Sequence, residues 1–268
     1  MMEMSVVSEG VREAEVSAPI LELRGVSRQF GGVHAVEDIS MSVYEGQVVG
    51  LIGPNGAGKS TIVSLIAGSL QSTDGKIFLD QKELSGLAPD VIARRGIART
   101  FQVSAEFSRL TVLQNLLVAP KEQKGEGLFG ALAGRRYWGG SESQNIERAF
   151  ELLTQFGMLA KANDYAGSMS GGQRRLLEVM RAIMVGPRVL LLDEPTAGVH
   201  PNMIGELREQ LVRLRNQGLT ILMVEHEMDF VRSMCDVVIV MARGRVIAKG
   251  TLDEVRSDPK VMEAYVAG

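Results

Sequence analysis

The sequence predicts an α/β fold built on a mostly parallel sheet. Strand-like and helix-like segments alternate along much of the chain, an order that gives parallel strands joined by right-handed crossovers. Two continuous apolar runs, residues 48–52 (VVGLI) and 189–192 (VLLL), are typical of strands buried on both faces of a sheet. With 268 residues, the chain is long enough for one large domain or for one domain with a sub-lobe.

The N-terminal part predicts additional, antiparallel β structure. Residues 1–18 contain four glutamates and lack the basic-then-apolar order of a signal peptide, so we expect a disordered leader. Residues 20–26 alternate apolar and polar side chains, the period of a half-exposed strand, and residues 39–43 give a second strand signal. A hairpin-type turn at residues 73–75 leads into a further strand at residues 76–80.

The middle of the chain changes character. From about residue 103 to 168, glycines and polar residues separate helical stretches such as residues 146–159, which predicts an inserted helical sub-lobe. The α/β pattern then resumes with one helix and two strands, at residues 203–217, 219–224 and 237–241. A tail follows from about residue 250 to 268. We therefore expect residues 19–268 to form a single domain.

Composition limits the classes of function. The formal net charge is −3, without the strongly basic footprint of a nucleic-acid binder, so no nucleic-acid partner is expected. The single cysteine, Cys235, cannot form an internal disulfide and fits a reducing, cytosolic setting. No segment approaches the roughly 20 apolar residues needed to cross a bilayer. Any role at a membrane would therefore depend on a partner.

The strongest motif is residues 53–61 (GPNGAGKST), which match G-x-x-x-x-G-K-[ST] between a predicted strand and a predicted helix. Glycines let backbone N–H groups wrap a phosphate chain, and the start of the following helix favours an anion. Lys59 can reach the β- and γ-phosphates, and Ser60 can hold Mg²⁺. The motif predicts a P-loop NTPase core. Its nucleotide-binding residues are Gly53, Pro54, Asn55, Gly56, Ala57, Gly58, Lys59, Ser60 and Thr61.

A second motif follows the apolar run at residues 189–192, which ends in Asp193 and Glu194. A carboxylate at the end of a buried strand can bind Mg²⁺ directly or through water. The next carboxylate can polarise an attacking water. Such a pair by itself would often be a surface turn, but together with a phosphate loop it predicts Asp193 as a metal ligand and Glu194 as a catalytic residue.

A third motif, residues 169–173 (MSGGQ), opens a helical run. Ser170 has the features of a helix N-cap, and the glycines expose N–H groups at the positive helix end. The motif resembles the signature sequence of ABC ATPases, usually Leu-Ser-Gly-Gly-Gln. The resemblance implies that ATP joins two such subunits face to face, with Ser170 and Gly172 of one subunit closing over the γ-phosphate held by the other. Gly171 and Gln173 belong to the same predicted site.

The resemblance extends to other positions. Gln102, in residues 99–102 (RTFQ), resembles the Q-loop glutamine, which implies contact with the metal or the attacking water and communication with a membrane partner. His226 resembles the switch histidine near the γ-phosphate, and Phe30 resembles the aromatic residue that stacks on adenine. One element departs from the family pattern: after Gly198 the family often has an aspartate, whereas this chain has Val-His-Pro, which puts the contacts of His200 across the dimer in doubt.

A finer resemblance is to importers of branched-chain or other hydrophobic amino acids and to the related urea and amide systems. Residues 98–102 (ARTFQ), the insert with residues 116–119 and 127–129, and the tail at residues 250–265 carry it. It implies transmembrane permease subunits, a second ATP-binding subunit of the same or another kind and, indirectly, a substrate-binding protein as partners. The chain would lie peripherally at the cytoplasmic face of the membrane.

Two alternatives stay open at this point. The ATPase of a lipopolysaccharide exporter shares such a tail, although it would be expected to lack the long insert and the Arg-Thr-Phe-Gln sequence. Signature-bearing ATPases also serve in DNA repair, chromosome maintenance and translation, usually with long coiled coils or two tandem ATPase domains. This chain has neither feature.

Overall fold

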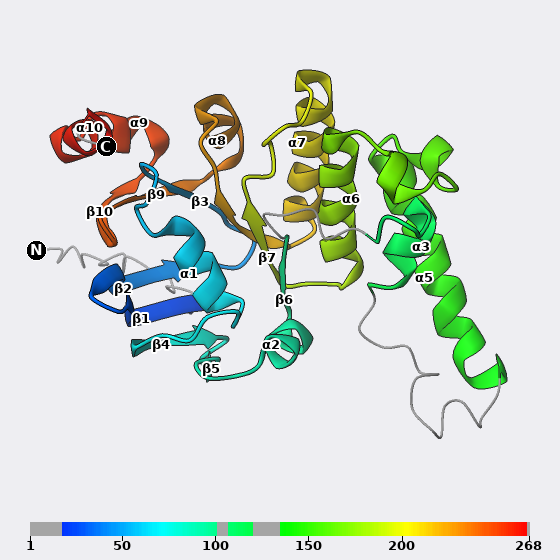
Figure 1. Cartoon of the computed structure of the whole chain (residues 1–268), viewed down its shortest axis with the longest axis horizontal. Coiled ribbons are helices and arrows are strands. Elements are labelled where there is room, and N and C mark those ends of the chain that lie inside the picture. Colours follow the sequence, from blue (N-terminus) through cyan, green and yellow to red (C-terminus); the bar gives the residue numbers. More distant parts are fainter. Residues whose placement is uncertain (1–17, 101–106, 120–134, 267–268) are drawn as a thin grey trace, which may run out of the picture.

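The computed structural model describes residues 18–100, 107–119 and 135–266 (Figure 1). It contains a four-stranded sheet in the order β2-β1-β4-β5 and a six-stranded sheet in the order β10-β9-β3-β8-β7-β6. The predicted fold class is confirmed: an α/β core with a mostly parallel sheet and an antiparallel part near the N-terminus.

The six-stranded sheet forms the centre of the molecule. Its strands are β3 (Val48–Ile52), β6 (Ile97–Arg99), β7 (Val189–Asp193), β8 (Thr220–Val224), β9 (Val237–Ala242) and β10 (Arg245–Gly250). All neighbours are parallel except β10, which pairs antiparallel with β9. Every residue of β3, β7 and β8 is buried. Because successive side chains point to opposite faces and both faces are covered, these strands need apolar residues at nearly every position.

The antiparallel sheet consists of β1 (Leu21–Phe30), β2 (Val33–Val43), β4 (Asp74–Leu79) and β5 (Lys82–Glu83). The prediction for residues 73–75 needs a correction, because Asp74 and Gly75 lie inside β4 and not in a turn before it. Gly75 has a φ of 78°, and a Cβ atom there would lie 2.3 Å from the carbonyl oxygen of Gly25. This glycine therefore permits the close approach of β1 and β4.

The helices divide between the faces of the large sheet. They are α1 (Lys59–Ile66), α2 (Pro89–Arg95), α3 (Val112–Leu117), α5 (Arg135–Gln155), α6 (Gly171–Met184), α7 (Pro201–Asn216), α8 (Met228–Met234), α9 (Leu252–Arg256) and α10 (Pro259–Val266). Residues of α1 share one core with the antiparallel sheet, and residues of α6, α7 and α8 share another (Figure 1). Along β7, Leu191 belongs to the first core and Leu192 to the second, as the alternation of a strand requires.

Helices α3 and α5 lie between β6 and β7 in the sequence, within the range where the helical sub-lobe was predicted. Leu116 from α3, Leu153 from α5 and Leu176 from α6 are fully buried in one cluster. In Figure 1 these helices lie at the side of the molecule remote from α9 and α10. Other parts of the predicted sub-lobe, including residues 120–134 with the insert at 127–129, lie outside the described residues, as does most of the predicted leader. The domain boundaries stay predictions.

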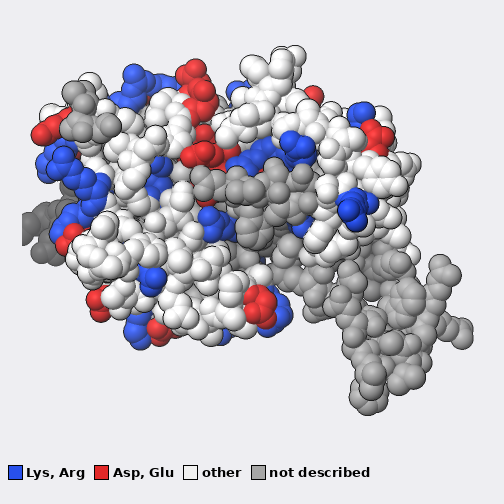
Figure 2. Space-filling model, in the orientation of Figure 1, with Lys and Arg blue, Asp and Glu red and all other residues white. Residues whose placement is uncertain are grey.

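The tail forms α9 and α10, which pack on the end of the large sheet. Val255 and Val261 are buried against Val238 and Val240 of β9. Within the described ranges, none of the helices combines the length and apolarity needed to span a bilayer. On the face drawn in Figure 2, acidic and basic side chains are interspersed over the described surface.

Candidate functional site

The phosphate loop connects β3 to α1 and is shaped by glycines. Gly53, Gly56 and Gly58 have φ values of 146°, 75° and 100°, a region that side-chain-bearing residues rarely adopt. A Cβ atom at Gly53 would lie 2.0 Å from the carbonyl oxygen of Met241, and one at Gly58 would lie 2.5 Å from that of Ala35. The loop is therefore pressed against β9 and β2. Open space lies beside Gly56, where an added Cβ atom would meet nothing within 4 Å.

Lys59 lies inside this loop with only 6% of its surface exposed. Its Nζ donates hydrogen bonds to the carbonyl oxygens of Gly53 and Pro54 at 2.7 and 2.9 Å. Burial lowers the pKa of Lys59, while the negative charges of Glu194 and Asp193 oppose that shift. The lysine and the two carboxylates, distant in sequence, therefore lie close enough for their charges to interact, and Ser60 and Thr61 follow Lys59 in the first turn of α1.

Asp193 ends β7 and is completely buried. Its Oδ2 accepts a hydrogen bond from Arg99 Nη2 at 3.1 Å, and its backbone N–H donates to Thr100 Oγ1 at 3.2 Å. Its Oδ1 is buried and has no hydrogen-bond partner among the described residues. A buried carboxylate oxygen left unpaired is costly, so this atom is poised to accept a ligand.

Glu194 and His226 meet at the carboxyl ends of two neighbouring strands. His226 Nε2 lies 3.2 Å from Glu194 Oε1, and both side chains are partly exposed. The backbone N–H of Glu194 donates to the carbonyl oxygen of Val224 at 2.9 Å, which joins the ends of β7 and β8. Glu194 itself has a φ of 52°, an unusual value for a residue other than glycine. The parallel pairing of β7 and β8 is what brings the two predicted catalytic residues together.

Two residues that the sequence analysis assigned no role support these loops. Glu225, only 2% exposed, accepts hydrogen bonds from the N–H and hydroxyl of Thr196 at 2.9 and 2.8 Å and from the N–H of His226 at 3.0 Å. Arg175 of α6 donates through Nη2 to the carbonyl oxygens of Asp193 and Glu194. The sequence offers Glu225 and Glu227 equally, and only the fold shows that the first is buried.

Replacing Glu225 by glutamine should loosen the catalytic loops. An amide has one acceptor oxygen, so its NH₂ group would face either the donors of Thr196 or the N–H of His226. We expect a loss of about 2 kcal/mol in the free energy of unfolding. We also expect an ATPase rate lowered about tenfold, because Glu225 orients the loop that carries a predicted catalytic residue. Chemical denaturation and steady-state hydrolysis measure these effects, with exposed Glu206→Gln as the control. Wild-type stability would contradict the supporting role.

The signature residues form the predicted helix cap. Ser170 caps α6, its Oγ accepting from the N–H of Gln173 at 3.3 Å, while the N–H of Ser170 donates to Gln173 Oε1 at 3.0 Å. Gly172 packs closely on Val199, where an added Cβ atom would lie 3.3 Å from Cα. In Figure 1, α6 lies on the other side of β7 from α1. A single chain therefore does not bring these residues, Gly171 included, to its own phosphate loop.

The remaining predicted residues lie around this centre. Phe30 ends β1 and is 43% exposed, but the Arg28 guanidinium lies over its ring, 4.6 Å from the centroid. A flat ligand could therefore stack on that face only if Arg28 moved aside. Gln102 lies outside the described residues. His200 caps α7, its Nδ1 accepting from the N–H of Asn202 at 3.4 Å. No group of His, Cys, Asp and Glu side chains in the described ranges forms a separate metal cluster.

The C-terminal tail reaches the phosphate loop. A cavity of ≈ 410 Å³ is bounded by the outer side of the loop at Asn55 and Gly56 and by Lys260 and Ala264 of α10. Burial raises the pKa of the Tyr265 phenol, and a hydrogen bond with the backbone of Gly53 opposes the shift. The tail thus contacts the backbone of the predicted nucleotide-binding loop as well as the sheet.

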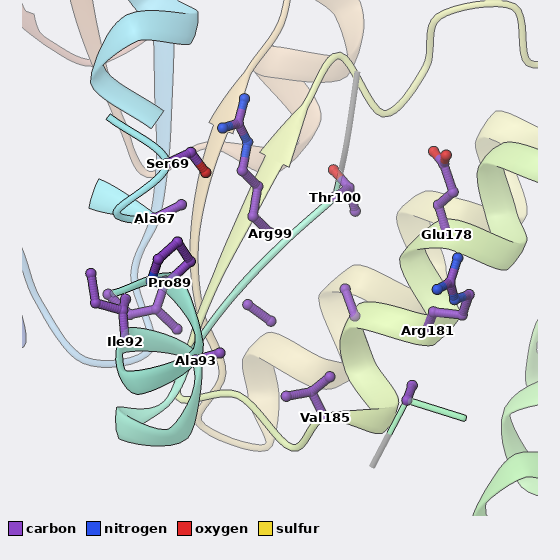
Figure 3. Close-up of a pocket in the computed structure, with 14 residues that line it drawn as sticks. Ala67, Ser69, Pro89, Ile92, Ala93, Arg99, Thr100, Glu178, Arg181 and Val185 are labelled. Atoms are coloured by element: carbon purple, nitrogen blue, oxygen red, sulfur yellow. The ribbon is translucent and has the colours of Figure 1, made fainter. Parts of the chain in front are cut away.

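A groove lies beside the site, between α2, β6 and α6. It encloses ≈ 290 Å³ and is lined mainly by small and apolar side chains of β6, α2 and α6. Figure 3 shows Arg99 and Thr100 at the end of β6, Ile92 on α2, and Glu178 and Arg181 on α6. Arg99 lines this groove and also donates a hydrogen bond to Asp193, so it connects the groove to the buried carboxylate.

Comparisons with known proteins identify the family. A family model described as ABC transporter matches residues 36–197, and one described as branched-chain amino acid ATP-binding cassette transporter matches residues 245–266. The chain is 39% identical over 252 residues to the high-affinity branched-chain amino acid transport ATP-binding protein LivG of Salmonella typhimurium, covering 94% of this chain and 99% of that protein. It is 40% identical over 256 residues to the corresponding protein BraF of Pseudomonas aeruginosa, with the same coverage.

Solved structures agree with these relatives. A nucleotide-free ATP-binding cassette from an ABC transporter superposes with a TM-score of 0.80 at 35% identity, covering 92% of this chain and 98% of that one. A cassette in its ADP conformation gives a TM-score of 0.79 at 34% identity, covering 94% of this chain and 100% of that one. With the phosphate loop, the strand-end carboxylates and the capped signature helix in one fold, the chain belongs to the ABC ATPases, within the family of branched-chain amino acid transport ATP-binding proteins.

Proposed function

We propose that this ATPase powers an importer of branched-chain or other hydrophobic amino acids. The observation that carries the ATPase part is the convergence of Lys59, Asp193, Glu194 and His226 beside the phosphate loop. The transport part is supported by the similarity to branched-chain amino acid transport ATP-binding proteins along 94% of the chain.

In this proposal each residue has a defined task. Backbone N–H groups of the phosphate loop bind the β- and γ-phosphates, and Lys59 exchanges its hydrogen bonds to Gly53 and Pro54 for bonds to phosphate oxygens. Glu194 accepts a proton from the attacking water, and His226 donates a hydrogen bond toward the γ-phosphate. The partly exposed positions of Glu194 and His226 support these roles, because both side chains are accessible to a reactant.

The residues around Asp193 fit a magnesium ion. Mg²⁺ prefers oxygen ligands, and the buried Oδ1 of Asp193 has no hydrogen-bond partner in the described part of the chain. We propose that Asp193 and the hydroxyl of Ser60 hold the ion, with Gln102 as a further ligand. When bound, the ion neutralises charge on the phosphates.

We propose that the active unit contains a second ATP-binding subunit, identical or related, placed face to face with the first. Ser170 and Gly171 are exposed at the start of α6 and are separated from the phosphate loop of their own chain. The hydroxyl of Ser170, the N–H group of Gly172 and the positive end of the helix would then bind the γ-phosphate held by the partner subunit.

Transport requires partners in the membrane. We propose that permease subunits dock in the groove between α2, β6 and α6, and that the chain lies peripherally at the cytoplasmic face of the membrane. The groove supports this because it is concave and mainly apolar and adjoins the segment that leads to Gln102. A substrate-binding protein would contact the permease, not this chain.

Co-purification and uptake test the proposal together. The tagged chain, isolated from its native membranes in mild detergent, should recover permease subunits and a second ATP-binding subunit. A strain lacking the chain should lose uptake of radiolabelled leucine and regain it with the wild-type gene, but not with the Glu194→Gln variant. Recovery of lipid-export components, or loss of urea uptake with leucine uptake intact, would contradict the assigned substrate and leave the ATPase chemistry standing.

A further inference from the structure

Arg99 connects two of the residues that are proposed to hold magnesium: it contacts Asp193 directly and reaches the backbone of Ser60 through Ser64. Its Nη2 donates to Asp193 Oδ2 at 3.1 Å, and its Nη1 donates to Ser64 Oγ at 2.9 Å. Ser64 Oγ in turn donates to the carbonyl oxygen of Ser60 at 2.7 Å. One guanidinium therefore links the end of β7 to the first turns of α1.

The charge balance explains why a cation is needed at this place. Asp193 is completely buried, and Arg99 is the cation that pairs with its carboxylate, with a side chain only 13% exposed. A buried carboxylate without a counter-ion is strongly destabilising. The second cation near the site, Lys59, is hydrogen-bonded to the loop carbonyls instead. Lys59 is close enough for its charge to interact with Asp193, but Arg99 is the side chain in direct ion-pair contact with this carboxylate within the described residues.

A bound magnesium ion would remove this need. The two positive groups would then share one carboxylate and repel each other, at short range and away from bulk water. The Nε of Arg99 is also buried and has no hydrogen-bond partner in the described ranges. The position of Arg99 beside Asp193 therefore leaves one N–H donor of the guanidinium group unsatisfied. The groove that Arg99 lines encloses ≈ 290 Å³, which offers space for a displaced side chain. In Figure 3, Arg99 lies between Ser69 and Thr100.

We propose that Arg99 is an internal counter-ion that neutralises Asp193 in the nucleotide-free subunit and leaves this carboxylate for the groove when magnesium and nucleotide bind. The inference rests on the proposed magnesium site. Arg99 and the metal then compete for Asp193, so Arg99 raises the magnesium concentration that tight nucleotide binding requires. Any group that binds Arg99 in the groove would remove it from Asp193 and so increase the affinity of the site for magnesium.

The test compares two full-length proteins, the Glu194→Gln variant and the same variant that also carries Arg99→Met. The Glu194→Gln change is present in both so that ATP hydrolysis does not disturb the titration. Binding of a fluorescent ATP analogue is followed at increasing free Mg²⁺, and thermal unfolding is followed with and without Mg²⁺ and ATP. We expect Arg99→Met to lower the Mg²⁺ concentration at half-maximal binding about tenfold, because a competitor is gone.

Thermal unfolding gives the second readout. Without ligands, Arg99→Met should lower Tm by about 5–10 °C, because Asp193 loses its counter-ion. With saturating Mg²⁺ and ATP, the two proteins should differ by no more than about 2 °C, because Arg99 no longer pairs with Asp193 in that state. An unchanged or raised Mg²⁺ requirement, or an equal loss of Tm in both states, would overturn the proposal and make Arg99 a fixed structural partner.

Two further variants keep the outcomes separate. Arg99→Lys keeps a positive charge but cannot bridge Asp193 and Ser64 together, so it should shift the Mg²⁺ requirement in the same direction by about threefold, even if Arg99→Met does not fold. Arg94→Met removes the arginine of an exposed pair with Asp90 and should change neither readout. If nucleotide binding to the parent chain does not depend on Mg²⁺ at all, the magnesium site itself is wrong, whereas a dependence that Arg99 variants do not shift overturns only the role of Arg99.

Discussion

The Glu194→Gln variant should bind ATP about as tightly as the wild-type chain and hydrolyse it at least ~100-fold more slowly. Glutamine has nearly the same shape, so the loop held by Arg175 and Glu225 should persist. It cannot accept a proton from the attacking water. Because ATP is retained, the variant should also accumulate as a dimer of ATP-binding subunits in the presence of Mg²⁺ and ATP.

Steady-state hydrolysis, equilibrium binding of a fluorescent ATP analogue and size-exclusion chromatography measure these three effects. Glu209→Gln, an exposed position on α7, is the matched control and should behave as wild type. Hydrolysis at the wild-type rate by Glu194→Gln would exclude Glu194 as the residue that activates water. A variant that neither binds ATP nor forms the dimer would instead assign Glu194 to nucleotide binding.

The Lys59→Ala variant should lose about 100-fold in affinity for ATP. Lys59 is the cation of the phosphate loop, and its buried position places its charge among the groups that would surround the phosphates. Alanine also removes the hydrogen bonds to Gly53 and Pro54, so the loop would lose internal support. Both changes weaken phosphate binding, and hydrolysis at low ATP should fall accordingly.

Calorimetric titration with ATP measures this affinity, and circular dichroism establishes whether the variant is folded. Lys59→Met preserves more of the buried volume and should show the same loss if charge is the cause. Lys76→Ala, which removes the lysine of an exposed pair with Glu83, is the control. If Lys59→Ala and Lys59→Met bind ATP as the wild type does, the interpretation of residues 53–61 as a phosphate loop is wrong.

Much of the fold could be predicted because its signals are local. The phosphate loop lies between β3 and α1 as its motif requires, and the cap at Ser170 depends on a residue only three positions away. The buried strands β3 and β7 follow directly from continuous apolar runs. The error at residues 73–75 has the opposite cause. Gly75 is required by contact with Gly25 in a distant strand, which the local sequence does not contain.

The roles of the predicted site residues stay predictions, but some features of the site follow from local sequence and others from the tertiary structure. The sequence by itself determined which residue types carry the chemistry: the loop with Lys59, the carboxylates Asp193 and Glu194, and the capped signature helix. These patterns arise from hydrogen bonds and dihedral angles within a few residues, so residue type and spacing suffice. Only the tertiary structure decided that Arg99 pairs with Asp193 and that Glu225 is the buried glutamate. Both depend on the strand order β3-β8-β7-β6, because adjacent strand ends bring together side chains that no local pattern relates.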